Sequence, residues 1–406
     1  MNVFSFLDLL AEIFYKKKPD IEKIQKKGLL AVKIAQTFAL RIDFLDEAKC
    51  FELSKLFNHV EKIPSEGVEA LLESYVGKSF LENFNEFEKK AFASASIGQV
   101  HRAKLKTSED VAVKIIKGDF KNKFENDVES TLRLFRFIIK FYPKLSKVAD
   151  PIGILNNIRQ FTVDELDLTN ELANRNILYE IFKEYNERVD LSKLRFIDIK
   201  NELTSQNVMV SKYIEGQTFD KLLSEGKLSY DMVLELFHIH GFYIFGVGTF
   251  HGDIHPGNII LQDDKINFVD CGAIGTVGDK LRKGLFYFME SLSLYDFSAC
   301  AYWLNQMSDV LLEGERYEIF KEKLVRLYDD FEDASVSQVS LTKRMMETIK
   351  LGVHSGMSFE QGMFPVIKSL MYMDGMVLRC KPDAVLMKDM RRFIDEFKRF
   401  IEFKDG

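Results

Sequence analysis

The sequence has few cysteines, and their spacing indicates neither a zinc site nor a disulfide framework. Cys50, Cys271, Cys300 and Cys380 lie far apart without a C-x-x-C pair, which fits a reducing, cytoplasmic compartment. An excess of basic residues is also missing. The 56 Lys and Arg residues stand against 62 Asp and Glu, which gives a formal net charge of −6. We therefore expect no nucleic-acid partner.

Long hydrophobic runs are missing as well. The longest uncharged stretch, residues 236–252, has 17 residues and includes three histidines. A membrane-spanning helix needs about 20 mostly apolar residues. We therefore expect residues 236–252 to form a buried central helix. His238 and His240 are two residues apart in it and would diverge on a helix, which favours packing over metal binding.

The two ends of the chain contain amphipathic patterns. Residues 1–10 have their apolar positions before Lys16, Lys17 and Lys18, which is not the order of a secretory signal. They predict a helix that lies on a membrane surface or packs on the protein. Near the other end, residues 391–401 are too charged to span a membrane but carry apolar residues at helical spacing. Peripheral attachment to the inner face of a membrane is compatible with both patterns.

The composition fits a folded protein with at least two lobes. The chain has 406 residues, a mass of 47.1 kDa and 46% hydrophobic residues, enough for a substantial core. It contains neither repeats nor a low-complexity linker. Intrinsic disorder is therefore excluded for most of its length.

The stretch His251-Gly-Asp-Ile-His-Pro-Gly-Asn258 combines the groups that nucleotide phosphoryl chemistry needs. Asp253 is followed five positions later by Asn258, and Asp270 comes twelve residues after that, just before Cys271-Gly272. Mg²⁺ prefers oxygen ligands from a few side chains together with phosphates. The residues between Asn258 and Asp270 predict a β-hairpin that returns Asp270 beside Asn258. The alternative is a solvated turn in which Asp and Asn cap backbone groups.

A lysine in a β-branched run is the second candidate site residue. Lys114 lies in Val111-Ala-Val-Lys-Ile-Ile116, where an unpaired buried charge would be costly. In kinase-like folds the lysine of this strand grips the α- and β-phosphates and pairs with a helix glutamate. A snorkelling lysine is the alternative.

The acidic segment 164–176 supplies the partner that such a lysine needs. At helical spacing Asp167, Glu171 and Asn174 share a face, so Glu171 is predicted to point at Lys114. Glu165 and Asp167 would approach the same pocket from the preceding turn. The alternative is an acidic first turn that complements the helix dipole.

The segment Ala91-Phe-Ala-Ser-Ala-Ser-Ile-Gly-Gln-Val-His-Arg-Ala103 resembles the alanine-rich loop of the UbiB/ADCK (AarF-domain) atypical kinases. In that family alanines replace the glycines of an ordinary kinase phosphate loop. The K-x-G-Q element of the family is matched by residues 33–36, its E-x-D element by residues 165–167, and its closing helix and turn by residues 370–383. The resemblance runs from about residue 28 to about residue 393.

The resemblance implies an α+β, atypical protein-kinase-like bilobal fold that binds ATP and Mg²⁺ between its lobes. It implies a Lys114–Glu171 ion pair, metal ligands at Asn258 and Asp270, and a catalytic aspartate at Asp253. ATP would also contact the alanine-rich loop and the hinge backbone, and the K-x-x-Q and E-x-D elements would be regulatory, with the first folding across the active site. The residues concerned are Ala95, Ser96, Gln99 and Tyr213 for ATP, and Lys33, Gln36, Glu165 and Asp167 for regulation.

Three positions depart from the family pattern. Ala35 stands where the family has glycine, which puts close backbone approach at that turn in doubt. Ser94 replaces an alanine and adds a hydroxyl that could reach a phosphate. Cys271 stands where an ordinary kinase has phenylalanine, and we expect it to pack inertly. Alanines in the phosphate loop should stiffen it, so slow or unusual turnover is expected.

These observations predict three segments and one function. Residues 1–90 form a helical extension, 91–214 an N-lobe with the alanine-rich loop and the E-x-D insertion, and 215–406 a helical C-lobe. The function implied by the resemblance is ATP hydrolysis or phosphoryl transfer linked to ubiquinone or other isoprenoid-lipid metabolism. Partners would be an isoprenoid lipid, a membrane surface or lipid-biosynthesis enzymes. Two alternatives remain: a small-molecule phosphotransferase of the aminoglycoside or choline kinase type, and a nucleotide-sensing scaffold without chemistry.

Overall fold

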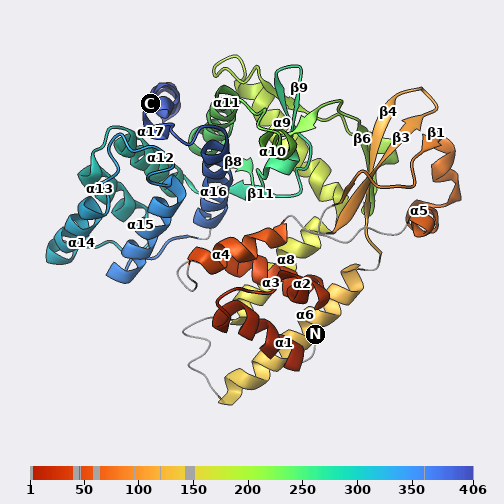
Figure 1. Cartoon of the computed structure of the whole chain (residues 1–406), viewed down its shortest axis with the longest axis horizontal. Helices are drawn as coiled ribbons and strands as arrows, with labels where there is room; N and C mark the ends of the chain where they lie inside the picture. Colours follow the sequence, from red (N-terminus) through yellow and green to blue (C-terminus); the bar gives the residue numbers. More distant parts are fainter. Residues whose placement is uncertain are drawn as a thin grey trace. The chain divides into compact units, whose positions relative to one another are not determined.

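The computed structural model divides the chain into two compact units (Figure 1). The first contains residues 1–172 and 198–213, and the second contains residues 173–197 and 214–406. The residues described are 3–39, 45, 47–57, 65–94, 97–118, 120–141, 151–360 and 362–405. The resemblance to the atypical kinases also predicts a loop at Pro64, after the K-x-x-Q element, and this residue lies outside the described ones.

An antiparallel sheet forms one part of the first unit. Its strand order is β1-β3-β4-β6, and β2 pairs with β3 on the side. Alternate residues of β4 such as Val111, Val113 and Ile115 are buried, because successive side chains of a strand point to opposite faces. They share a core with α5 and η4. The bounds are β1 Phe84–Phe87, β2 Ala93–Ser94, β3 Gly98–Leu105, β4 Asp110–Ile116, β6 Val208–Lys212, α5 Val68–Val76 and η4 Lys78–Asn83.

A helical part with a second core completes the first unit. Its N-terminal helices pack with α6 and α8, which come from the long segment between Lys114 and Glu171. Leu9, Ile34 and Phe124 lie in this common core. The bounds are α1 Val3–Leu10, η1 Ala11–Tyr15, α2 Ile21–Lys26, α3 Leu29–Ala39, α4 Glu47–Ser54, η2 Lys55–Phe57, η3 Ser65–Gly67, α6 Phe120–Phe141 and α8 Pro151–Glu165.

The second unit combines small sheets with a large set of helices. One sheet has the order β5-β10-β9-β7, with β5 parallel to β10, and β11 pairs antiparallel with β8. The strands are β5 Leu194–Phe196, β7 Gln217–Thr218, β8 Thr249–His251, β9 Ile259–Gln262, β10 Lys265–Phe268 and β11 Ile274–Thr276. The helices are α9 Leu168–Tyr185, which begins in the first unit, α10 Phe219–Ser224, α11 Tyr230–Gly241, η6 Phe242–Val247, η7 Pro256–Asn258, α12 Asp279–Ser293, α13 Phe297–Met307, α14 Gly314–Leu327, α15 Leu341–Ser355, α16 Met363–Cys380 and α17 Leu386–Asp405, and η5 Asn201–Leu203 lies in the first unit.

The predicted buried helix over residues 236–252 is only partly correct. α11 is buried as expected and continues into a π-helical turn, η6, but the helix ends at Gly248. Gly248 has a φ of +87°, a conformation that favours glycine and stops a helix. The last residues of the stretch form β8, which pairs with β11. A glycine stop and a tertiary strand partner therefore override the apolar pattern.

The two amphipathic ends differ in what they bury. In α1, Phe6 and Leu9 are buried in the helical core, whereas Phe4 and Leu7 are exposed. In contrast, the apolar residues of α17 from Leu386 to Ile401 are buried, whereas Phe403 near its end is 75% exposed, and α17 packs against α11 and α12. The apolar face of α17 is therefore used inside the second unit.

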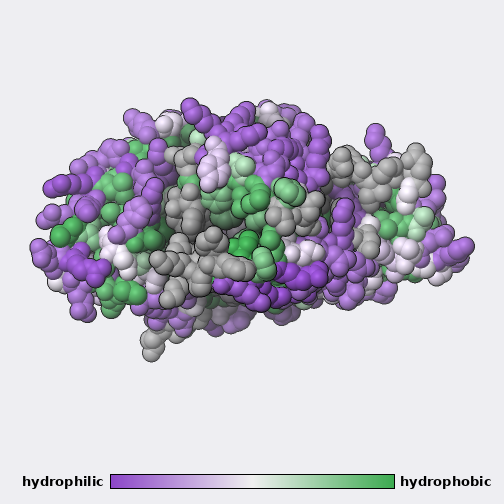
Figure 2. Space-filling model, turned by 90° about the horizontal axis from the view of Figure 1, so that it is seen from below, coloured by the Kyte–Doolittle hydropathy of each residue, from purple (hydrophilic) through white to green (hydrophobic). Residues whose placement is uncertain are grey.

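Polar residues dominate the surface of the face drawn in Figure 2, with smaller hydrophobic groups among them. Within the described residues, no helix is both long and apolar enough to cross a membrane.

Candidate active site

The loop after β8 is shaped by two histidines. The His251 Nδ1 atom accepts a hydrogen bond from the Asp253 backbone N–H at 3.1 Å, and His255 Nδ1 accepts one from the Gly257 N–H at 3.0 Å. Burial lowers the pKa of both imidazoles, so they are neutral and can accept. Each histidine therefore closes a tight turn two residues ahead, and together they present Asp253.

Asn258 is held against Asp253 by its side-chain amide. The Nδ2 group donates to the Asp253 backbone carbonyl at 3.0 Å and approaches the Asp253 Oδ2 atom at 3.3 Å. Since both partners are acceptors, the amide nitrogen must face Asp253. The Asn258 Oδ1 oxygen is thereby directed elsewhere, as a cation ligand requires.

The predicted hairpin is present and returns the chain as expected. β9 and β10 pair in register, and the Val269 N–H donates to the Asn258 backbone carbonyl at 3.1 Å. Asp270 follows directly, and its Oδ1 atom accepts from the Gly272 N–H at 3.0 Å. The Asn174 side chain donates to the Cys271 carbonyl at 3.1 Å and fixes the same turn to α9.

The amide of Asn258 and the carboxylate of Asp270 fit a hard divalent cation. Both offer oxygen atoms, and Mg²⁺ is usually held by one or two such side chains with phosphates completing the shell. The same loop needs a glycine at position 252, because a Cβ there would come within 3.1 Å of the Gly275 backbone nitrogen. Among the described residues, no cluster of three or more His, Cys, Asp or Glu side chains offers another metal site.

A lysine that the motif analysis missed completes the surroundings of Asp253. Lys368 of α16 places its Nζ atom 2.7 Å from the Asp253 Oδ1 atom. Burial would raise the pKa of Asp253, but the charge and hydrogen bond of Lys368 hold it below its ordinary value. Asp253 is therefore ionised at neutral pH.

In the first unit, the predicted ion pair between Lys114 and Glu171 is present. The Nζ and Oε2 atoms lie 2.6 Å apart, and both side chains are buried. β4 supplies the lysine and the first turn of α9 the glutamate. Asp167 caps this helix, since its Oδ1 atom accepts from the Thr169 N–H at 3.0 Å and from the Thr169 hydroxyl. Such a cap fixes the direction in which Glu171 leaves the helix.

The other predicted regulatory residues meet in the helical part of the same unit. Lys33 of α3 forms an ion pair with Glu165 at the end of α8. The Gln36 side chain is buried and donates to the Leu56 carbonyl at 3.0 Å. Ala35 lies inside α3 and is fully buried, so the turn expected at this position is wrong: its Cβ contributes to a helix core.

The alanine-rich loop is described only in part. Ala95 and Ser96 lie outside the described residues. Gln99 is fully buried and contacts the His101 ring nitrogen at 2.8 Å. Gln99 is paired with Ile115 across β3 and β4, so its side chain lies on the sheet face opposite to that of Lys114.

Other predicted positions are placed as follows. Tyr213 follows β6, its N–H donates to the Asp110 carbonyl at 3.0 Å, and Arg102 lies 4.5 Å above its ring. Cys271 is buried, as expected for a packed thiol. Ser94 is half-buried, and its hydroxyl has no hydrogen-bond partner among the described residues.

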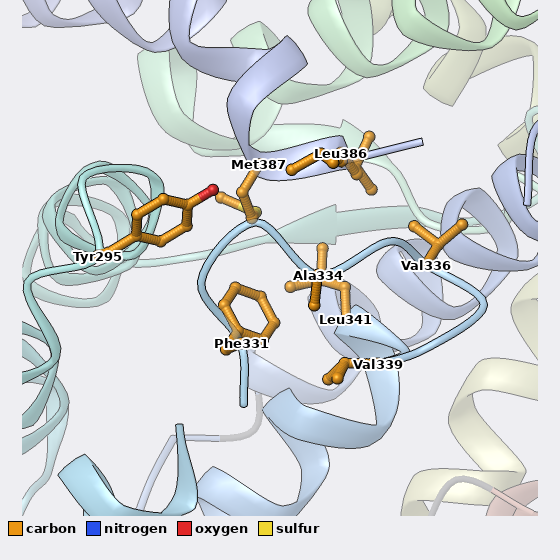
Figure 3. A pocket seen from close by; sticks show the side chains of 9 residues that line it. Tyr295, Phe331, Ala334, Val336, Val339, Leu341, Leu386 and Met387 are labelled. Atoms are coloured by element: carbon orange, nitrogen blue, oxygen red, sulfur yellow. The ribbon is translucent and has the colours of Figure 1, made fainter. Parts of the chain in front are cut away.

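An apolar pocket in the second unit carries none of this chemistry. Its lining includes Tyr295, Phe331, Val336, Leu341 and Met387 (Figure 3). The one polar group among these side chains is the Tyr295 hydroxyl, which donates to Asp333 at 3.0 Å. The charged and amide groups of the loop after β8 remain the candidate site.

Comparison with known proteins identifies the domain to which this arrangement belongs. Residues 55–303 match the ABC1 atypical kinase-like domain. The chain belongs to the ABC1 atypical kinase-like family. The resemblance to UbiB/ADCK kinases inferred from the loop residues is therefore confirmed, and the ABC1 match includes Lys114, Glu171, Asp253 and Asn258.

Several relatives of this ABC1 chain are known by name. It is 27% identical to an Arabidopsis thaliana protein named ACTIVITY OF BC1 COMPLEX KINASE 8, chloroplastic, with 84% of this chain and 44% of that protein covered. It is 26% identical to a probable protein kinase UbiB of Blochmanniella pennsylvanica, with 93% and 69% covered. The chain thus spans less than half of the Arabidopsis relative.

A solved structure supports the fold. The Mycobacterium tuberculosis protein Rv3197, determined in complex with erythromycin, aligns with a TM-score of 0.57 at 18% identity, over 96% of this chain and 90% of that one. At this identity the likeness concerns the fold alone. With the ABC1 match, it confirms the predicted mixed helix and sheet, kinase-like fold.

Proposed function

We propose that this chain binds Mg²⁺ and ATP and catalyses phosphoryl transfer or ATP hydrolysis in support of ubiquinone or other isoprenoid-lipid metabolism. The observation that carries the proposal is the arrangement of Asp253, Asn258 and the hairpin that returns Asp270. It combines an ionised carboxylate and an oriented amide oxygen in one loop with a second carboxylate at the end of the following hairpin. The ABC1 family membership supports the same chemistry.

Each residue has a role that follows from its chemistry. Asn258 and Asp270 would hold the metal, which supplies charge neutralisation for the phosphates when bound. Lys114, kept in place by Glu171, would contact the α- and β-phosphates. Ala95, Ser96 and the backbone at Tyr213 remain predicted contacts of the nucleotide.

Asp253 is the catalytic residue of this proposal. Because Lys368 keeps its carboxylate ionised, Asp253 can accept a hydrogen bond from an attacking hydroxyl or water, orient it and take up its proton. About a third of its side chain is exposed, 34%, so an acceptor can reach it.

The lipid pathway is proposed from the relatives. Homologues named as probable protein kinases UbiB cover 93% of this chain at 25–26% identity. Exposed Phe4 and Leu7 on α1 offer apolar side chains for peripheral contact with a membrane or with lipid-biosynthesis enzymes. An isoprenoid lipid is the expected small-molecule partner.

Phosphate release from ATP tests the proposal. We expect Asp253→Asn to lower turnover by at least about 100-fold, because it removes the proton acceptor. Asp263→Asn, in the exposed β9–β10 turn, should leave turnover unchanged. Assays with and without vesicles of anionic phospholipid and a prenylated quinone report the lipid response. Equal turnover in the parent and Asp253→Asn, with no lipid response, would leave only a scaffold, and phosphorylation of a soluble alcohol would favour a small-molecule phosphotransferase.

A further inference from the structure

A lysine from a helix that is distant in sequence contacts the catalytic loop. Lys368 lies on α16, outside the residues that match the ABC1 domain, and its ammonium is 2.7 Å from the Asp253 Oδ1 atom. The neighbouring Val366, Ile367 and Leu370 are buried, so α16 is fixed in the second unit and the lysine stem cannot swing freely. Only 16% of the Lys368 side chain is exposed.

An ion pair at this place is poorly explained by stability alone. Partly buried pairs gain little net free energy, because desolvation offsets the attraction. A lysine suits another purpose here. Its ammonium is a compact charge with three N–H donors, so it can contact a carboxylate and a phosphate oxygen at the same time.

A second group on α16 points to an oxygen-rich ligand. Tyr372 lies one helical turn after Lys368, and the Lys368 Nζ atom is 5.8 Å from the centre of its ring. The ring meets the His255 imidazole edge to face at 5.2 Å. The Tyr372 hydroxyl is enclosed and has no hydrogen-bond partner among the described residues. A buried donor without an acceptor is costly, so a bound oxygen atom would satisfy it.

We propose that Lys368, assisted by Tyr372, binds the terminal phosphoryl group of the nucleotide and makes the site prefer ATP over ADP. The inference rests on the proposed function, in which Asp253 faces that phosphoryl group. It assigns to α16 the recognition of the group that distinguishes the two nucleotides. The proposed function assigns Lys114 to the phosphates that ATP and ADP share, so replacing Lys114 should weaken the binding of both nucleotides, whereas replacing Lys368 should weaken that of ATP.

The test compares ATP and ADP affinity by calorimetry in the presence of Mg²⁺. Lys368→Met should weaken ATP binding by about 10- to 100-fold, the loss expected for one charge-assisted hydrogen bond, and change ADP binding less than about 2-fold. Lys368→Arg should restore most of the ATP affinity. Tyr372→Phe should lower ATP affinity by a smaller factor, again without an effect on ADP.

Lys388→Met is the matched control, because this lysine of α17 is 58% exposed and lies 3.8 Å from Asp333, away from the loop. It should bind both nucleotides as the parent does. Should Lys368→Met fail to fold, Lys368→Gln and Tyr372→Phe carry the same comparison. Equal losses of ATP and ADP affinity, or no loss of either, would overturn the inference while the parent still binds nucleotide. A parent that binds neither nucleotide would instead contradict the proposed function.

Discussion

At the scale of single residues, the buried pair of Lys114 and Glu171 is the most sensitive point of the first unit. Each of these buried charges is stabilised by its 2.6 Å contact with the other, and breaking a buried pair by removing one partner is strongly destabilising. We expect Glu171→Gln to lower the free energy of unfolding by about 3–5 kcal/mol and to weaken ATP binding. Urea denaturation followed by circular dichroism measures the first effect.

The control residue, Glu180, lies further along the same helix, α9. Glu180 is 66% exposed and forms a surface ion pair with Lys183 at 2.9 Å, so Glu180→Gln should cost less than about 0.5 kcal/mol. A double variant, Lys114→Met with Glu171→Leu, should be less destabilised than the sum of the single changes. Additive losses would show that the two side chains do not depend on each other.

Residues were predictable where a motif or a known kinase pattern covers both partners. Asp253 and Asn258 are close neighbours in one loop, and the pairing of Lys114 with Glu171, 57 residues later, was predicted from the strand lysine and helix glutamate of kinase-like folds. Lys368 reaches Asp253 from a helix more than a hundred residues later, and no periodicity reports such a contact. A lone lysine among the buried apolar residues of α16 was the available signal.

At the scale of elements, the junction of η6 and β8 depends on Gly248. Its φ of +87° disfavours side chains, and a Cβ would lie 3.0 Å from the Val277 carbonyl. We expect Gly248→Ala to lower the free energy of unfolding by about 1–2 kcal/mol or more. Gly375→Ala in α16, where a Cβ meets nothing within 4 Å, should instead stabilise by up to about 1 kcal/mol. Thermal unfolding of both variants measures these changes. An equal effect of the two substitutions would contradict the role assigned to Gly248.

The contact between α11 and α17 makes stability depend on pH. Burial lowers the pKa of His238, but hydrogen bonds to Glu235 and Glu396 outweigh it and raise the pKa to about 9. A pKa raised above the unfolded value of 6.5 gives stability that is complete below pH 6.5 and is lost as pH rises through 9. We expect a loss of roughly 3 kcal/mol over this window.

Denaturant unfolding between pH 6 and 10 measures this loss. His238→Gln should flatten the dependence over that window, whereas His354→Gln, at an exposed histidine of α15, should retain it. Burial lowers the pKa of His240, so this residue reduces stability only below about pH 6.5, where the unfolded imidazole takes up a proton, and the range from pH 6.5 to 9 reports on His238. A parent whose stability is constant from pH 6.5 to 9 would contradict the assignment.

Some elements could be predicted from the sequence pattern alone, and others could not. The β9–β10 hairpin was predictable because a two-residue turn, Asp263-Asp264, separates two β-branched runs, and both residues have positive φ as a tight hairpin requires. The end of the central helix was not, because it depends on a glycine stop and on the pairing of β8 with β11. Gln99 and Lys114 lie on opposite faces of the sheet because of the pairing register of β3 and β4, and a sequence motif does not specify that register.

At the scale of the whole molecule, each compact unit has its own buried core, and candidate residues occur in both. The ABC1 match, residues 55–303, includes parts of the two units. The helices before it and after it contribute Lys33, Gln36 and Lys368. The predicted regulatory residues Lys33 and Gln36 and the contact of Lys368 with Asp253 therefore include residues outside the matched domain.

Calorimetric titration of ATP into the full chain, with Mg²⁺ and again with EDTA, tests the central claim most directly. We predict one nucleotide bound per chain with Mg²⁺, and binding weakened at least about tenfold by EDTA or by Asp270→Asn, since each removes the metal from the phosphates. Binding that is absent, or that is equally strong with EDTA and in Asp270→Asn, would contradict the account.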